Sequence, residues 1–306
     1  PPDHWHVIGA YDDAAASQLI ADCMLDCLVD CTGHTSRSRL PLFVNRLAPL
    51  QLSWGGYFST TGLETIDAVV MDDAHLAPGI ERYFAEELIR VPSRFIYAPP
   101  SFAPPVTDAP FFRNGHITFG SFNNVAKINA DVIATWAQIL NCVPDSRLIL
   151  KLRGFTDAPY CDAMRAQFAR HGIAADRIAL RPFSIYRDTL IEYRDIDIAL
   201  DPFPFTGGQT SLDALWMGVP VVTMAGFTPV ERQGHAFVHA IGKSEWSVAD
   251  RDAYVEMAVA LARDPDRLRT IRFDQRDLIR SSPLSDAEAF VQYLVNSIEH
   301  KLKLKS

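Results

Sequence analysis

The stretch FTGGQTSLDALWMG, residues 205–218, follows an apolar strand-like run and opens an amphipathic helical pattern. Gly207 and Gly208 let the backbone turn tightly and approach a ligand closely. The free N–H groups at the start of the following helix, together with the helix dipole, favour an anion such as a diphosphate. Ligands of open α/β sheets bind where strands end and helices begin, so this turn is a candidate binding site.

Polar side chains continue the same stretch. The hydroxyl of Thr210 adds a hydrogen-bond donor, with Gln209 and Ser211 as further candidates. Asp213, one helical turn later, can accept hydrogen bonds from ribose hydroxyls. This combination is typical of a nucleoside diphosphate site. The alternative is purely structural: the glycines make the turn, and Thr210 or Ser211 caps the helix.

A second candidate is SFNNVAKIN, residues 121–129, just after another expected strand. Asn124 and Lys127 would reach the same cleft. If a sugar–phosphate bond breaks there, negative charge develops on the departing diphosphate, and a fixed ammonium group stabilises that charge more than the ground state. The alternative is that Lys127 is a solvated surface lysine.

Two loops in the first third of the chain form the third cluster, CTGHTSRSRLPLF and SWGGYFSTTGL. We expect both to face the cleft, where His34 would orient a sugar or acceptor and the turn at Gly62 would let backbone approach the sugar. The alternative is a buried histidine and ordinary turns. His4, in DHWHV, has weaker local support and is otherwise a surface residue.

The elements that must position these residues alternate between strand and helix. Apolar runs near residues 6–11, 26–31, 50–56 and 66–73 are expected strands before a proline-rich segment, PPSFAPPVTDAP. Clearer strands follow near 117–122, 147–152, 177–183, 196–202 and 219–225, and the chain is helical from about residue 250. Such alternation predicts parallel sheets covered on both faces. In the helix at 129–141, Asn129 is the expected N-cap.

Composition restricts the class of protein. The 306 residues are 48% hydrophobic and carry a formal net charge of −8, so we expect a globular chain without the basic surface that nucleic acid requires. No apolar run is long enough to span a membrane and no secretory signal is visible, which predicts a soluble, cytoplasmic protein. The odd number of five cysteines predicts reduced thiols. Cys23, Cys27 and Cys31 lack paired Cys-x-x-Cys spacing, so we expect these three to pack in the core and not to bind a metal.

Several ordered motifs resemble the catalytic region of the O-GlcNAc transferase and SPINDLY family. They are SRSRLPLFVNRLAPLQLSWGGYFSTTG, FGSFNNVAKIN, LDPFPFTGGQTSLDALWMGVPVVTMAG, TPVERQG and RSSPLSDAEAFVQYL. The resemblance covers nearly the whole chain and looks like that of a bacterial member. It implies an α/β fold of GT-B type with two Rossmann-like lobes, parallel sheets and a helical C-terminus.

The same resemblance implies a domain organisation and a reaction. The expected segments are the remainder of the N-terminal lobe at 1–98, a proline-rich linker at 99–114, the UDP-binding lobe at 115–282 and a C-terminal helix at 283–306. The family transfers GlcNAc, with inversion, from UDP-GlcNAc to serine or threonine hydroxyls of a protein or peptide acceptor, without a metal or other cofactor. By this comparison the chain starts inside the first lobe, which predicts an incomplete first lobe.

Residue roles follow by correspondence. Lys127 matches the lysine that steadies the diphosphate, with Asn124 at a nearby amide position and Thr210 at a phosphate-contacting threonine. Asp213 matches the ribose-binding aspartate, and the backbone of Ser184 occupies the uracil-contacting position. His4 matches a histidine near the sugar if one gap is allowed, and Arg232 fits a family arginine.

The chain also departs from the family pattern. Gln209 and Ser211 flank Thr210 where relatives have a run of threonines, Thr189 stands where a nucleotide-contacting histidine is usual, and Tyr186 where animal members have lysine. Two further hypotheses therefore stay open. One is a related enzyme that transfers glucose from UDP-glucose to asparagine, and the other is a nucleotide-sugar-binding protein that has lost catalysis.

Overall fold

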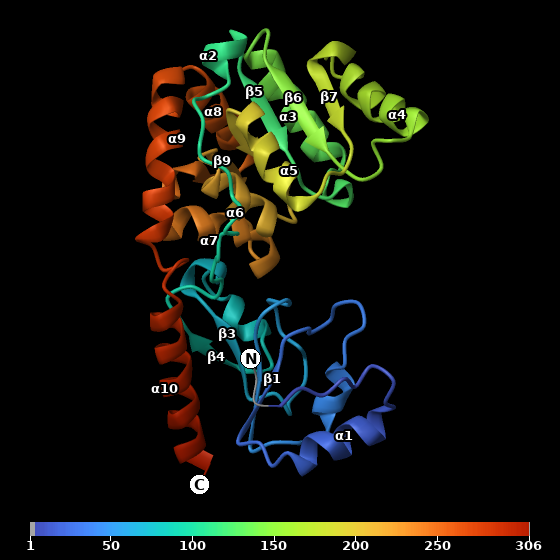
Figure 1. Cartoon of the computed structure of the whole chain (residues 1–306), viewed down its shortest axis with the longest axis vertical. Coiled ribbons are helices and arrows are strands. Elements are labelled where there is room, and N and C mark those ends of the chain that lie inside the picture. The colour runs from blue at the N-terminus through green and yellow to red at the C-terminus, as the bar shows by residue number, and fades with distance from the viewer. Residues whose placement is uncertain (1–3, 306) are drawn as a thin grey trace. The chain divides into compact units, whose positions relative to one another are not determined.

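The computed structural model describes residues 4–305, which form two compact units (Figure 1). The first unit comprises the described residues up to Phe95 together with those from Ala287 onward. The second unit is Ile96–Asp286. The proline-rich segment 99–114, expected as a linker, belongs to the second unit, whereas the last helix belongs to the first.

The first unit contains a four-stranded parallel sheet in the order β1-β2-β3-β4. Its strands are β1 (Cys27–Asp30), β2 (Leu50–Ser53), β3 (Ala68–Met71) and β4 (Glu87–Arg90). Its helices are α1 (Asp13–Asp22) and α10 (Ala287–Lys305). Every residue of β2 and β3 is buried, as expected for central strands of a parallel sheet, because both faces of such a sheet are covered.

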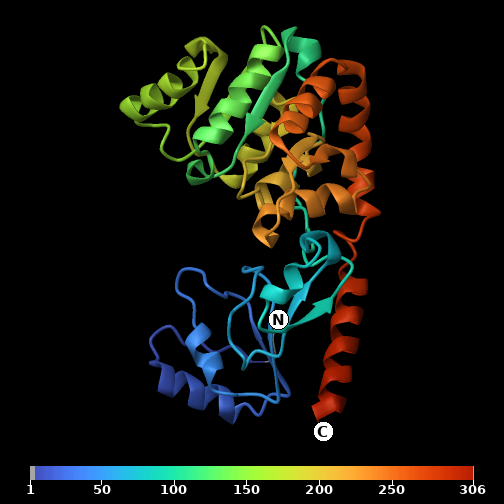
Figure 2. The same cartoon turned by 180° about the vertical axis from the view of Figure 1, so that it is seen from behind.

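Helix α10 packs against this sheet and extends past its edge (Figure 2). The ring of Phe290 lies 4.9 Å from that of Trp54, which follows β2. Farther along the helix, Lys301 bonds Glu87 at 2.5 Å and Lys305 bonds Asp67 at 2.6 Å. An aromatic contact at one end and ion pairs at the other therefore fix α10 to the strands.

Two sequence expectations for the first unit are wrong. Residues 6–11 form coil and a turn instead of a strand, and the side chain of Val7 is 78% exposed. The alternating pattern there finds no neighbouring strand among the described residues. Conversely, β4 was not expected, because it is short and only Ile89 of its four residues is buried, the pattern of an edge strand.

The second unit contains a six-stranded parallel sheet in the order β10-β9-β8-β5-β6-β7. Its strands are β5 (Thr118–Ser121), β6 (Arg147–Lys151), β7 (Ile178–Arg181), β8 (Ile198–Leu200), β9 (Val221–Met224) and β10 (Ser247–Val248). Its helices are α2 (Phe111–Asn114), α3 (Ala130–Cys142), α4 (Ala158–Ala169), α5 (Tyr186–Glu192), α6 (Gln209–Trp216), α7 (Gln233–Ala240), α8 (Arg251–Ala262) and α9 (Pro265–Arg280). The five strands expected after the proline-rich segment are all present.

Helix α3 shows how the sequence determines these elements. The side chain of Asn129 accepts a hydrogen bond of 2.9 Å from the N–H of Val132, so the predicted N-cap is confirmed. Ile133, Trp136 and Leu140 recur at helical spacing and are at most 2% exposed. The buried face contributes to the core of the second unit.

The strand order places a topological switch point between β5 and β8. From β5 the chain first builds outward through β6 and β7, and then returns to add β8 on the other side of β5. The loops after β5 and β8 therefore leave the same edge of the sheet in diverging directions, which is where α/β folds bind ligands. The expected α/β fold, with Rossmann-like parallel sheets and a helical C-terminus, is confirmed.

Other expectations concern membranes and cysteines. Among residues 4–305, no helix combines the length and the apolar character needed to cross a bilayer. All five cysteines are free thiols, but Cys23, Cys31 and Cys142 are exposed. The expectation that Cys23, Cys27 and Cys31 pack in the core is therefore wrong for Cys23 and Cys31, because the end of α1 and the loop after β1 leave them at the surface.

Candidate active site

The turn between β8 and α6 is folded around a buried carboxylate, Asp201, which is 1% exposed. One oxygen of Asp201 accepts from the Gly207 N–H at 2.7 Å and from the Ser211 hydroxyl at 3.1 Å, and the other accepts from Thr223 at 2.9 Å. Burial raises the pKa of Asp201, against the lowering effect of these bonds and of nearby Lys127. Ser211 was predicted as a donor to a ligand, but its hydroxyl is engaged in this network.

Gly207 lies at a point of very close approach. A Cβ atom there would collide with the Ser211 hydroxyl and lie 2.6 Å from the Asp201 carboxylate. At Gly208 the nearest atom to a Cβ would be the side-chain oxygen of Gln233, at 3.4 Å. The turn therefore requires glycine at 207 for steric reasons, while 208 has more space.

Helix α6 begins at Gln209 with Gly208 as its N-cap, and no side chain caps it. Within the described part of the chain, the N–H groups of Gly208, Gln209 and Thr210 donate no hydrogen bond. Three backbone donors are thus available at the positive end of the helix dipole, an arrangement suited to a phosphate.

Lys127 reaches this turn from the loop after β5. It ends a short 3-10 turn, Val125–Lys127, which Asn124 caps by accepting from the N–H of Ala126 at 3.0 Å. The Lys127 ammonium donates to the Thr206 carbonyl at 2.7 Å and lies 4.0 Å from the centre of the Phe205 ring. Burial lowers the pKa of Lys127, partly offset by the charge of Asp201. The expected convergence of Lys127 with the glycine turn is observed.

A pocket of about 400 Å³ opens beside this turn, within the second unit. Its lining comprises Phe122, Asn123, Asn124, Lys151, Leu152, Arg153, Phe183, Ser184, Tyr186, Thr189, Gln209, Thr210 and Asp213. Five of these are residues that the sequence predicted as ligand-binding: Asn124, Ser184, Gln209, Thr210 and Asp213. The Thr210 hydroxyl donates to the side-chain oxygen of Asn123 at 3.0 Å, which ties the start of α6 to the loop after β5.

Asp213 is held by three donors. Its Oδ1 accepts from Tyr97 at 3.0 Å, from Tyr186 at 2.8 Å and from the amide of Gln209 at 2.8 Å. Burial raises the pKa of Asp213, and these three hydrogen bonds lower it without cancelling the effect of burial. The sequence predicted Gln209 as a donor to a ligand, treated Tyr186 only as a departure from relatives, and gave no indication of Tyr97.

A polar network also lines the pocket, and the sequence predicted Ser184 and Thr189 near the nucleotide but not their partners Lys151 and Glu192. The Ser184 hydroxyl lies 3.0 Å from that of Thr189 and donates to Glu192 at 2.9 Å. Lys151 bonds the same Glu192 oxygen at 2.7 Å and the Pro182 carbonyl at 2.8 Å. The available signal was a lysine at the carboxyl end of the apolar strand RLILK, a position that faces the ligand edge of a parallel sheet.

The remaining predicted residues lie in the first unit. The His34 Nε2 bonds the Thr61 carbonyl at 2.8 Å, and the imidazole packs edge-on against Tyr57 with ring centres 5.3 Å apart. Gly62 follows directly with φ of +74°, in the left-handed region that favours glycine. The loops after β1 and β2 therefore meet at His34. The imidazole is exposed, so the alternative of a buried histidine is wrong.

His4 is placed differently. It is exposed and lines a pocket of about 560 Å³ with His6, Ile8, Leu19, Ile20, Cys23 and Leu25. None of the other predicted site residues lines this pocket. The structure thus groups His34 with Gly62 but does not group His4 with either.

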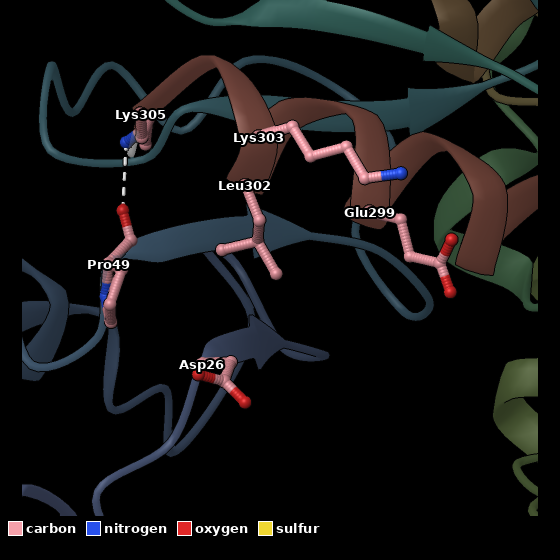
Figure 3. A pocket seen from close by; sticks show the side chains of 6 residues that line it. All are labelled: Asp26, Pro49, Glu299, Leu302, Lys303 and Lys305. Atoms are coloured by element: carbon pink, nitrogen blue, oxygen red, sulfur yellow. Dashed lines mark hydrogen bonds between the residues drawn. The ribbon is translucent and has the colours of Figure 1, made fainter.

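A further pocket of about 430 Å³ lies between the end of α10 and the starts of β1 and β2 (Figure 3). Asp26, Pro49, Glu299, Leu302, Lys303 and Lys305 line it, and Lys305 donates to the Pro49 carbonyl at 2.8 Å. It contains no predicted residue and lies at the amino ends of the strands, away from the edge where α/β sheets bind ligands.

Comparison with known proteins identifies the lineage. Residues 111–294 match the sequence profile of Glycosyl transferase family 41. The chain is 38% identical over 296 residues to the probable UDP-N-acetylglucosamine–peptide N-acetylglucosaminyltransferase SPINDLY of Petunia hybrida. The aligned region covers 95% of this chain and 31% of that protein. It is 24% identical over 307 residues to the probable enzyme of the same activity, SEC, of Arabidopsis thaliana.

Solved structures agree with the sequence comparison. A mutant of the Thermobaculum terrenum O-GlcNAc transferase superposes with a TM-score of 0.92 at 31% identity, covering 99% of this chain and 58% of that one. Sucrose-phosphate synthase of Thermosynechococcus elongatus, with a TM-score of 0.57 and 15% identity, shares the fold alone. The chain spans about a third of the length of the curated SPINDLY proteins that it matches.

Proposed function

The chain belongs to glycosyltransferase family 41, and from this premise we propose that it transfers GlcNAc from UDP-GlcNAc to serine or threonine hydroxyls of a protein acceptor. The observation that carries the proposal is the meeting of Lys127 with the Gly207–Gly208 turn beside the pocket of Asp213. A cation, three free N–H groups and a carboxylate within one pocket region match the diphosphate and ribose of a UDP-sugar.

In the proposed reaction the acceptor oxygen attacks the anomeric carbon and the bond from that carbon to the diphosphate oxygen breaks. The electron pair of the broken bond stays on the departing UDP, and the acceptor proton passes to a phosphate oxygen. Attack opposite the leaving group inverts the anomeric configuration. We assign the stabilisation of the departing charge to Lys127 and to the N–H groups at the start of α6, so the step needs no cofactor.

Each unit contributes residues to the proposal. In the second unit, Asp213 would bind the ribose, Thr210 and Asn124 would lie near the phosphates, and the Ser184 segment would meet the base. In the first unit, His34 and the Gly62 turn would contact the sugar or acceptor. The net charge of −8 gives no support to a nucleic-acid partner, and five free thiols support a reducing, cytoplasmic compartment.

Calorimetry with UDP tests the site, and a turnover assay tests the reaction. We expect saturable UDP binding, and GlcNAc addition to a panel of serine- and threonine-containing peptides detected by mass spectrometry. UDP-glucose is the matched donor: faster transfer from UDP-glucose, or transfer to asparagine, would replace the proposed donor or acceptor. A folded chain that binds no UDP would overturn the proposal entirely.

A further inference from the structure

Asp213 accepts hydrogen bonds from three separate segments of the chain. Tyr97 lies at the start of the second unit, Tyr186 begins α5 and Gln209 begins α6. All three donate to the same oxygen, Oδ1, at 2.8 to 3.0 Å. The other oxygen, Oδ2, accepts no hydrogen bond from any residue in the described range. One carboxylate oxygen is therefore fixed, and the second is left for the pocket that Asp213 lines.

The surroundings of Asp213 make it depend on these donors. Asp213 is only 3% exposed. A buried carboxylate without hydrogen-bond partners is disfavoured in its charged form, so Asp213 needs these donors to stay ionised. The titratable groups that face it are Tyr97, Tyr186 and Tyr193, none of which is a cation at neutral pH. The cations around this cluster are Arg276 of α9, which interacts with Tyr97, and Lys151 and Arg153, which line the same pocket; none of them forms an ion pair with Asp213 in the described range. Hydroxyl and amide donors thus replace an ion pair.

We propose that Tyr97 is a positioning residue of the nucleotide site: with Tyr186 and Gln209 it fixes Oδ1 of Asp213 so that Oδ2 presents an ionised acceptor to the ribose diol. The proposal rests on the proposed function and adds residues to it. A vicinal diol offers two O–H donors, and a carboxylate accepts both more strongly than a neutral acid does.

Tyr97 separates positioning from direct contact. It is 3% exposed and does not line the pocket, whereas Tyr186 and Gln209 line the pocket and are exposed enough to touch a ligand themselves. The backbone of Tyr97 donates to the Leu284 carbonyl at 2.7 Å, and its ring lies 6.0 Å from that of Trp216. Because these contacts do not involve the hydroxyl, Tyr97→Phe removes the hydrogen bond and keeps the packing.

The test compares UDP with 2′,3′-dideoxy-UDP by calorimetry between pH 5 and 8. Both ligands carry the same diphosphate, so the ratio of their affinities isolates the diol. In the unmodified protein we expect the preference for UDP to be full at pH 8 and to fall as pH drops and Asp213 takes up a proton. In Tyr97→Phe the fall should start about one pH unit higher, because a donor to the carboxylate is missing.

Tyr193→Phe is the matched control. Its hydroxyl is also buried but donates to the Thr210 carbonyl at 2.8 Å, so its removal should leave the pH profile of the ratio in place. If the unmodified protein binds no UDP, the proposed function fails. The positioning role is overturned if the unmodified protein binds UDP but the pH profile of the affinity ratio is the same in Tyr97→Phe. It is also overturned if Tyr97→Phe weakens the binding of both ligands equally at every pH. Should Tyr97→Phe not fold, Tyr186→Phe removes the neighbouring bond to Oδ1; because Tyr186 lines the pocket, only a shift of the pH profile, and not a change of the ratio at pH 8, then tests the shared role of the Oδ1 donors.

Discussion

The ammonium group of Lys127 donates to the carbonyl oxygen of Thr206 across 2.7 Å, and this bond joins the loop after β5 to the turn after β8. The two loops flank the switch point of the sheet. The lysine therefore has two functions to perform, since it supports the turn and also supplies the positive charge beside it.

Lys127→Ala should reduce turnover about 100- to 1000-fold while weakening UDP binding less than about tenfold. The reason is that the lysine stabilises charge that is complete only when the sugar bond has broken. The Thr206 carbonyl keeps a second donor, the Gln233 amide at 3.4 Å, so the turn retains support. Lys243→Ala, which removes a lysine beside Trp246, is the control. Equal losses in turnover and UDP affinity would show that Lys127 is not selective for the transition state.

Gly207→Ala should destabilise the protein by about 1–3 kcal/mol, because the new methyl group collides with Ser211 and Asp201. UDP binding should weaken as well, since the N–H groups of the turn would be displaced. Gly208→Ala adds the same methyl group where the nearest atom is 3.4 Å away, and should be milder in both measurements. Urea unfolding and UDP calorimetry provide the comparison, and identical behaviour of the two variants would contradict the steric argument.

The convergence of Lys127 with residues 205–208 could be predicted because parallel strands end at the same edge of a sheet, whatever their order. Local signals also sufficed for the N-cap at Asn129, whose partner is three residues away. Tyr97 could not be found this way, because its bond to Asp213 spans 116 positions, and it lies just before a proline-rich segment of no regular pattern. Ser211 was assigned to a ligand because a hydroxyl at a helix start suits either role, and only the fold brings Asp201 to it.

Asp197 provides a prediction about pH. Burial raises the pKa of Asp197 to about 6, although the N–H groups of Thr118 and Phe111 donate to it at 2.9 and 3.0 Å. An acid with a raised pKa binds its proton more tightly in the folded state, so its contribution to stability is full below pH 4 and is lost as pH rises towards 6. The amide of Asp197→Asn does not titrate, so this variant lacks the pH-dependent contribution to stability.

The free energy of unfolding of the unmodified protein should therefore fall relative to Asp197→Asn by roughly 3 kcal/mol between pH 4 and pH 7. Urea unfolding of both proteins across this range measures the difference. Asp162→Asn, which makes the same substitution at a side chain that is 79% exposed, is the matched control. A constant difference between the unmodified protein and Asp197→Asn would mean that the buried carboxyl does not titrate in this range.

His34→Ala should separate acceptor or sugar handling from nucleotide binding. If the Nε2–H of His34 donates to the Thr61 carbonyl, the neutral ring presents Nδ1 as an acceptor, and Nδ1 has no hydrogen bond to residues 4–305. A sugar or acceptor hydroxyl is the donor that fits.

The pocket assigned to the nucleotide is lined only by residues between Phe122 and Asp213, so UDP affinity of His34→Ala should stay within about twofold while turnover falls at least about tenfold. His300→Ala, an exposed histidine on α10, controls for loss of a surface imidazole. Turnover that survives in His34→Ala, or a parallel loss of UDP binding, would remove His34 from the proposed reaction.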